Sequence, residues 1–173
     1  MTRLEQVVLD LERHATTAGW DAAPRLYALV KASELHKHEP ELAQQLEVPD
    51  EPGRIAALEQ PALPAGQTIE EVLSGIEWPE RVHGCVLIVE RILLPEDAED
   101  DIPADDPVTW ASKHPGREDV RLVVGVLREG SAHSAMRIRG HDSDDEVLSG
   151  PDLVPGLTDA LASTLQGSAH GPA

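Results

Sequence analysis

Two β-rich runs, 119–128 and 131–139, lie on either side of a short turn at Glu129-Gly130. Runs of this kind around a glycine-containing turn predict an antiparallel hairpin. A three-residue loop over 128–130, with Gly130 in the left-handed conformation, gives the hairpin one consistently apolar face. A two-residue loop mixes apolar with charged positions on both faces, so we favour the three-residue loop.

The longest apolar run, 84–94, is interrupted only by Glu90 and Arg91. This pattern is typical of a central strand that is covered on both faces, and we expect it to lie beside the hairpin. The run 25–31 predicts another strand, and 55–59 predicts a short strand at a sheet edge. The chain therefore indicates a mainly antiparallel sheet of four or five strands.

Helices are expected at both ends of the chain. The first segment has an aliphatic stripe between Thr2, which has the spacing of a capping box with the acidic residue three positions on, and Gly19, which stops the helix. Shorter helices are predicted over 40–46 and from Thr68 towards residue 78. In the last segment, after the plausible N-cap Asp152, leucines recur every four residues. They are Leu153, Leu157, Leu161 and Leu165.

The 173 residues contain no internal repeat and no linker long enough to divide them. We therefore expect a single α+β domain over 1–166, with the N- and C-terminal helices packed on the sheet, and a flexible tail over 167–173. The core has no phenylalanine, so aliphatic side chains must fill it. The proline-rich segment 47–67 and the acidic run 95–107 are expected to be mostly loop.

The formal net charge of −18 repels the phosphates of nucleic acids and of anionic lipids, so neither is expected as a partner. Solubility is the simplest interpretation of this charge; attraction to a basic partner and mimicry of nucleic acid are the alternatives. A single cysteine, Cys85, excludes an internal disulfide, and neither a targeting segment nor a membrane span is evident. These features favour a cytoplasmic protein.

Histidines and the cysteine offer little chemistry. His83 and Cys85 have the spacing that places two strand side chains on one face, but a cysteine beside apolar residues is more often a buried hydrophobe. His36 and His38 lie among glutamates, as metal ligands do. A solvated turn is the better interpretation because no established metal-binding motif accompanies them. We therefore assign no catalytic residue, no metal ligand and no cofactor.

Two acidic segments, 97–101 and 142–146, imitate the alternating oxygens of a calcium loop. Both lack the glycine at the sixth position and the glutamate at the twelfth, so a dedicated calcium site is not expected. Signatures of nucleotide-binding loops, dinucleotide folds and serine hydrolases are also absent. Whether the chain is an enzyme is left open, and the missing motifs favour a non-enzymatic role.

Arginines are concentrated in the predicted hairpin of an otherwise acidic chain. In the favoured register Arg121 lies directly opposite Arg137, with His133 and Arg139 on the same side. Two cations so placed require an anion between them. It is either a ligand or partner group held by Arg121, Arg137, Arg139 and His133, or a carboxylate of the protein, such as Glu90, Asp119 or one from a helix.

Several segments occur in a distinctive order: WPERVHGC, VER and LLP, HPGREDVRLVVGVLREG, AMRIRGHD and VLSGPDLVPGL. In this order they resemble a family of small, uncharacterised actinobacterial proteins, from the first helix to the last. The resemblance implies a bacterial cytoplasmic protein and carries over no activity. It makes certain residues part of the family pattern without a chemical role: Trp78, Cys85, Arg121, Arg128, Arg137, Arg139 and Pro155.

Size, acidity and element order are also similar to those of secretion chaperones, in which helices and an antiparallel sheet form a peptide-binding dimer. The leading hypothesis is thus a non-enzymatic module that binds or regulates a protein or peptide, with a homodimer as one option. A binder or enzyme for a small anionic ligand, using the arginine-rich face of the hairpin, is the alternative. A third hypothesis is nucleic-acid mimicry by the carboxylates of 96–106.

Overall fold

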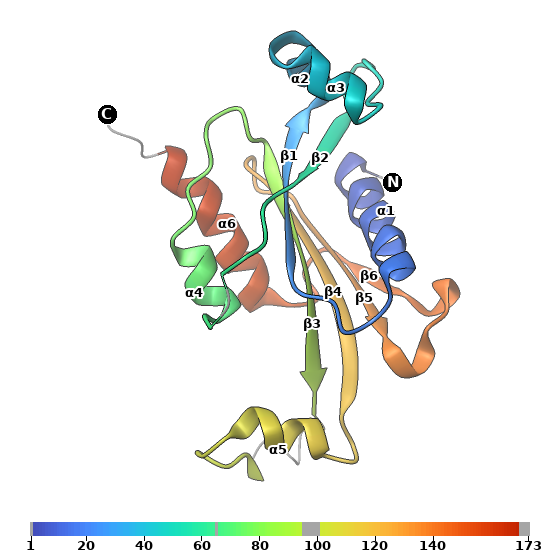
Figure 1. Ribbon diagram of the computed structural model, residues 1–173, viewed down its shortest axis with the longest axis vertical. Helices are drawn as coiled ribbons and strands as arrows, with labels where there is room; N and C mark the ends of the chain where they lie inside the picture. Colours follow the sequence, from blue (N-terminus) through green and yellow to red (C-terminus); the bar gives the residue numbers. More distant parts are fainter. Residues whose placement is uncertain (1, 65, 95–100, 170–173) are drawn as a thin grey trace.

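The computed structural model describes residues 2–64, 66–94 and 101–169. In these residues one antiparallel sheet has the strand order β2-β1-β3-β4-β5-β6 (Figure 1). The strands are β1 (Arg25–Lys31), β2 (Ile55–Glu59), β3 (Gly84–Leu93), β4 (Glu118–Leu127), β5 (Ala132–Ile138) and β6 (Leu148–Gly150). The α+β class is confirmed. The sheet has one strand more than expected because the three-residue β6 pairs with β5.

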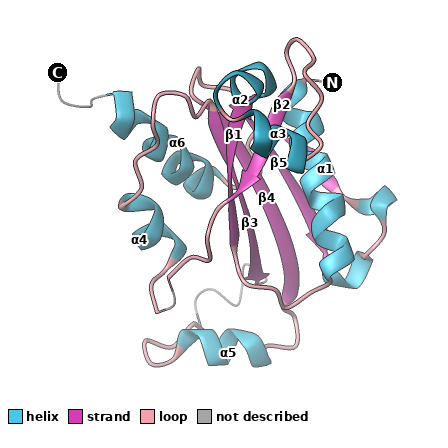
Figure 2. Ribbon diagram, turned by 45° about the horizontal axis from the view of Figure 1, so that its top comes forward, coloured by secondary structure: helices cyan, strands magenta, loops and turns pink. Residues whose placement is uncertain are grey.

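Helices lie on both sides of this sheet and beyond its ends (Figure 2). They are α1 (Arg3–Ala18), α2 (Ala32–His38), α3 (Pro40–Gln45), α4 (Ile69–Ser74), α5 (Pro107–Lys113) and α6 (Pro155–Ala169). Helix α1 covers one face, whereas α6 and α4 cover the other; α2 and α3 follow the end of β1, and α5 lies beyond the far end of β3. Two 3-10 turns, Arg139–His141 and Asp144–Glu146, precede β6.

The predicted hairpin register is confirmed. Arg121 pairs with Arg137, and Val126 pairs with Ala132. The amide of Leu127 donates to the carbonyl of Ser131 at 2.8 Å, so this closing pair encloses the three-residue loop 128–130, in which Gly130 adopts a φ of +112°. The amide of Gly130 donates to the carbonyl of Leu127 at 3.0 Å. The expected position of β3 is also confirmed, because it lies between β1 and β4, with both faces buried over residues 84–89.

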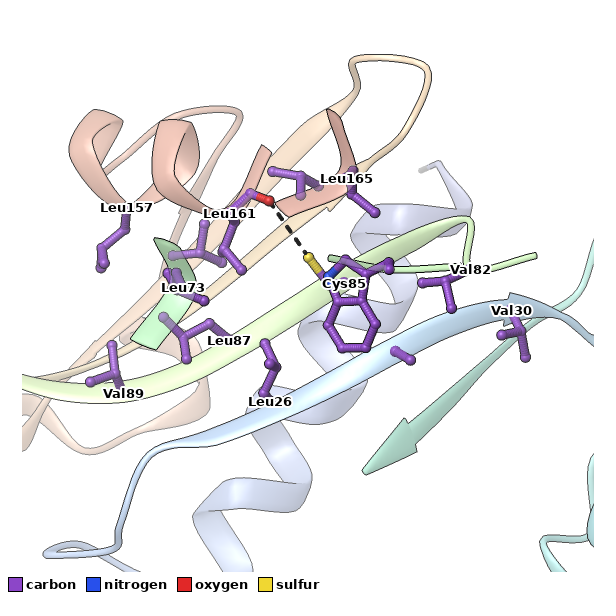
Figure 3. Close-up of a cluster of buried hydrophobic side chains, with 14 of the residues drawn as sticks. Leu26, Val30, Leu73, Val82, Cys85, Leu87, Val89, Leu157, Leu161 and Leu165 are labelled. Atoms are coloured by element: carbon purple, nitrogen blue, oxygen red, sulfur yellow. Dashed lines mark hydrogen bonds between the residues drawn. The ribbon is translucent and has the colours of Figure 1, made fainter. Parts of the chain in front are cut away.

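Alternation of side chains along the strands builds two separate cores. On the α1 face, the buried cluster contains Leu4, Val8, Ala15, Tyr27, Leu29, Val86, Ile88, Val123 and Ala135. On the α6 face, a larger cluster joins the sheet to α6 and α4, and Figure 3 shows Leu87 and Leu26 of the sheet near Leu161 and Leu73 of the two helices. Side chains on both faces of the central strands are therefore buried in these two cores.

Local sequence explains where the first helix begins and ends. The hydroxyl of Thr2 accepts a hydrogen bond from the amide of Glu5 at 3.1 Å, which satisfies one free donor of the first turn. Gly19 follows the last turn at a φ of +83°, a conformation that glycine adopts without steric cost. Thr68 caps α4 in the same way, through the amide of Glu71.

Four expectations need correction. Residues 32–38 form helix α2 rather than a turn; the helix is short and polar, and burial of Leu35 holds it to the core. Asp152 does not cap the last helix, which begins at Pro155, a residue suited to a first helical turn. The helix after Thr68 ends at Ser74, short of residue 78.

The acidic run 95–107 was expected to be mostly loop. Its last residue, Pro107, is instead the first residue of helix α5. Residues 95–100 of that run lie outside the described residues. Helix α6 continues to Ala169, past residue 166, the domain end expected from the sequence. Residues 170–173 of the predicted tail lie outside the described residues.

Gly125 allows the close approach of α1 to the sheet. A Cβ atom at this position would lie 2.8 Å from a methyl group of Val8 and 3.1 Å from one of Leu4, both buried. We expect Gly125→Ala to lower the free energy of unfolding by about 1–3 kcal/mol, because α1 must shift. Urea denaturation measures this change. Gly140→Ala, where a Cβ meets nothing within 4 Å, is the matched control; equal stability of the two variants would contradict the expectation.

Candidate functional site

Glu12 of α1 lies between the two arginines that face each other across the hairpin. Its carboxylate accepts hydrogen bonds from Arg137 Nε at 2.8 Å and from Arg137 Nη2 at 2.7 Å. Arg121 Nη1 lies 3.4 Å from the same carboxylate. Each of the three residues is only 1% exposed. A carboxylate from a helix is thus the anion that the paired arginines require.

The remaining donors of the two guanidinium groups bond to the protein as well. Arg121 donates to the carbonyl of Gly19 at 2.8 Å and to the hydroxyl of Thr16 at 3.2 Å. Its guanidinium carbon lies 4.6 Å from the ring centroid of Trp20, a cation–π contact. Arg137 Nη1 donates to Asp142 at 3.0 Å. The cluster therefore ties the end of α1 to the hairpin.

Two carboxylates at the outer side of this cluster are stabilised in their charged form. A hydrogen bond from Trp20 and another from Arg137 lower the pKa of Asp142. A bidentate hydrogen bond from Arg139, at 2.9 and 3.1 Å, lowers the pKa of Asp21. Both aspartates are exposed, so these pairs are expected to contribute little to stability.

The structure does not bring the four predicted binding residues together as one accessible clamp. Arg121 and Arg137 are sealed beneath α1, and His133, at 8% exposure, contacts the hydroxyl of Ser149 at 2.7 Å. Arg139 alone of the four has a substantially exposed side chain, at 43%, and it is paired with Asp21.

Cys85 is fully buried on the α6 face, as Figure 3 shows. Burial raises the pKa of its thiol to about 11, so the reactive thiolate is scarce near neutral pH. Its sulfur lies 3.7 Å from the hydroxyl of Thr164, which also accepts a hydrogen bond from Trp78. The thiol is therefore a packing group, and the side chain of His83 is not among its contacts.

On the α6 face of the sheet, a cavity of about 170 Å³ opens between β1, β2, helix α2 and residues 78–82. We call it the β2 groove. It is lined by Ala28, Val30, Glu34, Leu35, His38, Glu39, Leu58, Gln60, Trp78, Pro79, Arg81 and Val82. Val30 and Val82, two of these residues, lie at one end of the side-chain cluster in Figure 3. The floor is apolar and the rim is charged.

The wall of the β2 groove is held firmly. Arg128, next to the hairpin turn, donates to the carbonyl of Pro79 at 3.1 Å and to that of Val82 at 3.0 Å. Trp78 donates to Thr164 of α6 at 2.9 Å. Because both ends of the 78–82 segment are anchored, the groove is formed before any partner arrives.

A larger cavity of about 610 Å³, the end cavity, lies where β3 and β4 run beyond the central core. Its walls include three arginines, three carboxylates and the apolar Ile92 and Ile102; the charged residues are Arg91, Arg117, Arg139, Asp21, Glu90 and Asp119. Arg91 Nη2 bonds to Glu70 at 2.8 Å, but its buried Nε has no hydrogen-bond partner in the described part of the chain.

No cluster of three or more potential metal-ligating side chains occurs among the described residues. His36 Nε2 donates to the carbonyl of Val48, and His38 pairs with Glu34 at 3.1 Å. Asp142 is engaged by Trp20 and Arg137, and the calcium-like residues 97–100 lie outside the described range. Across the same residues, every helix is too short or too polar to span a membrane.

These features define an α+β protein with one antiparallel sheet, covered by helices on both faces and open at a groove beside β2. A family model described as PPA1309-like protein matches residues 4–166, so the chain belongs to the PPA1309-like family. This agrees with the nearly full-length resemblance found from the motifs, and the family description names no activity. No curated protein and no solved structure matches the chain significantly.

Sequence reasoning missed Glu12 and the β2 groove. Glu12 follows Leu4 and Val8 at intervals of four, on the buried stripe of α1, and an acid on such a stripe is itself a sign of a buried cationic partner. The groove had no comparable sign, because its walls come from segments that are distant in the sequence.

We expect Glu12→Gln to lower the free energy of unfolding by about 3–5 kcal/mol, because two buried guanidinium groups would lose the carboxylate that they share. Chemical denaturation measures the difference. Asp10→Asn, in the same helix, removes a carboxylate whose side chain is 73% exposed and should change stability by less than about 1 kcal/mol. Similar denaturation midpoints for Glu12→Gln and the wild type would show that the cluster does not hold α1.

Proposed function

We propose that this protein is a non-enzymatic binding module that captures an extended segment of a partner protein. The segment adds a strand to the open edge of β2 and inserts one apolar side chain into the β2 groove. The observation that carries this proposal is the position of a preformed apolar groove directly beside a sheet edge. Strand addition of this kind combines main-chain affinity with side-chain selectivity.

The hydrogen bonds of β2 identify the groups that are available to a partner. The Gln60 amide donates to the Leu26 carbonyl at 2.8 Å, and the Ala32 amide donates to the Arg54 carbonyl at 2.9 Å. These contacts fix the alternation of the antiparallel ladder, so even-numbered residues of β2 bond to β1. Ile55, Ala57 and Glu59 therefore direct their amides and carbonyls towards the open edge.

The size of the β2 groove suits a side chain better than a metabolite. Small-molecule sites usually have volumes of about 300–1,000 Å³, whereas a cavity of roughly 150 Å³ accommodates a group as large as benzene. At about 170 Å³ the groove matches one aliphatic side chain. Specificity for a single apolar anchor follows from this match.

The two other functions considered from the sequence have weaker support. An anion clamp built on Arg121 and Arg137 requires accessible guanidinium groups, and these are buried against Glu12. Nucleic-acid mimicry relies on the run 96–106, of which residues 96–100 lie outside the described residues.

We place this module in an actinobacterial cytoplasm. A buried free thiol, Cys85, and the strongly acidic composition are compatible with a reducing, crowded compartment. The homodimer expected from the analogy to secretion chaperones belongs to this proposal too, and native mass spectrometry of the purified protein tests it directly.

Two substitutions test the strand-addition surface. Ala57→Pro removes an amide that points to the open edge without removing a bond to β1, and Leu58→Arg places a charge at the groove. Peptides selected on the wild-type protein from a displayed random library, then measured by fluorescence anisotropy, should bind each variant at least about tenfold more weakly, which is ~1.4 kcal/mol.

Leu148→Arg on β6 is the matched control, because it adds the same charge to an exposed leucine at the opposite edge. Circular dichroism and thermal melting verify that all variants fold. If the library yields no binders, or if the selected peptides bind Ala57→Pro and Leu58→Arg as well as they bind the wild type, the proposed function is wrong.

A second candidate function is binding of a small anionic molecule in the end cavity. The specific observation in its favour is the buried Nε of Arg91, which has no hydrogen-bond partner among the described residues, in a cavity whose volume lies in the range of small-molecule sites. Arg117 stands 3.6 Å from Asp119 and retains donors for a ligand.

A thermal scan at low salt against inorganic phosphate and a series of carboxylic acids tests this second function. Ligand at 100 times its dissociation constant stabilises the folded state by about 2.7 kcal/mol, a readily measured shift in melting temperature. The shift should disappear in Arg91→Gln and persist in Arg13→Gln, which changes an exposed arginine on α1. No shift with any ligand, or equal shifts in both variants, would contradict it.

A further inference from the structure

The rim of the β2 groove carries information about the partner's sequence. We infer that the bound segment has a lysine or arginine two residues after its apolar anchor, and that it runs antiparallel to β2. This inference rests on the proposed function and adds the charge pattern and the direction of the partner.

Helix α2 supplies acidic groups at one end of the groove. It follows β1 directly after Lys31, the residue paired with Ile55, so α2 lies near the Ile55 end of β2. Glu34 and Glu39, both exposed, line the groove there. Glu34 is paired with His38 at 3.1 Å, and no lysine or arginine pairs with Glu39 in the described part of the chain. Arg81 belongs to the opposite wall.

The period of a β-strand sets the spacing between anchor and charge. An added strand presents alternate side chains to the groove face, and those opposite Leu58 and Ala56 share that face with them. Leu58 and Ala56 alternate with the β2 residues whose amides and carbonyls face the open edge. At such positions the side chains of an antiparallel pair approach each other most closely. The side chain opposite Leu58 enters the groove, and the next one on the same face meets the acidic rim.

The direction of the strand sets the order of the two residues. Each neighbouring pair in the described sheet is antiparallel, and antiparallel pairing is slightly more stable per residue than parallel pairing. In an antiparallel segment the residue opposite Ala56 comes two positions after the residue opposite Leu58. The partner motif is therefore apolar, any residue, then lysine or arginine.

The overall charge of the protein favours the same partner. A net charge of −18 attracts a basic segment and increases its rate of encounter, whereas it repels an acidic one. Glu39 adds a local attraction that acts on a basic residue at one position of the bound segment. The attraction from the overall charge does not depend on that position. Binding by a basic residue placed elsewhere in the segment would gain only the first effect.

Four synthetic, fluorescently labelled peptides on a common β-prone background test the inference. They contain Leu-x-Arg, Leu-x-Glu, Arg-x-Leu or Ala-x-Arg at the centre. Leu-x-Arg should bind the wild-type protein most tightly, with Leu-x-Glu weaker by about threefold to fivefold or more, the range of one exposed ion pair. Ala-x-Arg should be weaker still, because the anchor is missing.

A charge exchange isolates the contact. Glu39→Lys should weaken Leu-x-Arg and strengthen Leu-x-Glu, whereas Glu41→Lys, an equally large charge change at an exposed residue that does not line the groove, should change the preference between the two peptides much less. Higher ionic strength should reduce the difference between the two peptides.

The outcomes separate this inference from the proposed function. If Leu-x-Arg and Leu-x-Glu bind equally, or if Arg-x-Leu is preferred, the charge pattern or the direction is wrong, while loss of binding in Ala57→Pro still supports strand addition. If no leucine peptide binds, or if Ala57→Pro binds all of them unchanged, the proposed function itself is wrong.

Discussion

The carboxylate of Glu12, held between Arg121 and Arg137, is the interaction on which the arrangement of this protein depends. Burial of three charges carries a large desolvation cost, which good geometry and full hydrogen bonding can offset. Both carboxylate oxygens are bonded, and each guanidinium group has further partners. Two arginines directly opposite each other repel, so an anion must lie between them. Glu12 can lie there only when α1 takes one position along the sheet.

The placement of α1 decides which parts of the sheet stay open. Helix α1 covers mainly β4 and β5, while α6 and α4 cover β3 and β4 from the other side (Figure 1). On the α6 face, the β1–β2 end of the sheet is covered by the short helices α2 and α3 and by the 78–82 segment rather than by a long helix, and the β2 groove remains there. The groove and the open edge thus share a cause, since long helices cover the centre of the sheet and not its margin.

The sequence predicted those features that depend on one periodic pattern. The hairpin register followed because any other alignment puts charges among the aliphatic residues, and both Gly130 and the pairing of Arg121 with Arg137 came with it. Helix α2 escaped prediction because the tertiary packing of one leucine stabilises it rather than an apolar stripe, whereas the short helices α3 and α4 were predicted. Glu12 and the groove depend on contacts between distant segments, and periodicity says nothing about which segments meet.

The buried cluster also changes the electrostatics of the surface. It removes two cations and one anion from contact with water, so the exposed surface is more negative than the net charge of −18 indicates. The two arginines that face each other across the hairpin are used inside the protein, and carboxylates such as Glu39 remain outside. In the proposed function, the acids around the apolar groove select partners by charge before any side chain is inserted. The burial of Arg121 and Arg137 beneath α1 therefore makes the surface more acidic, which favours the binding proposed at β2.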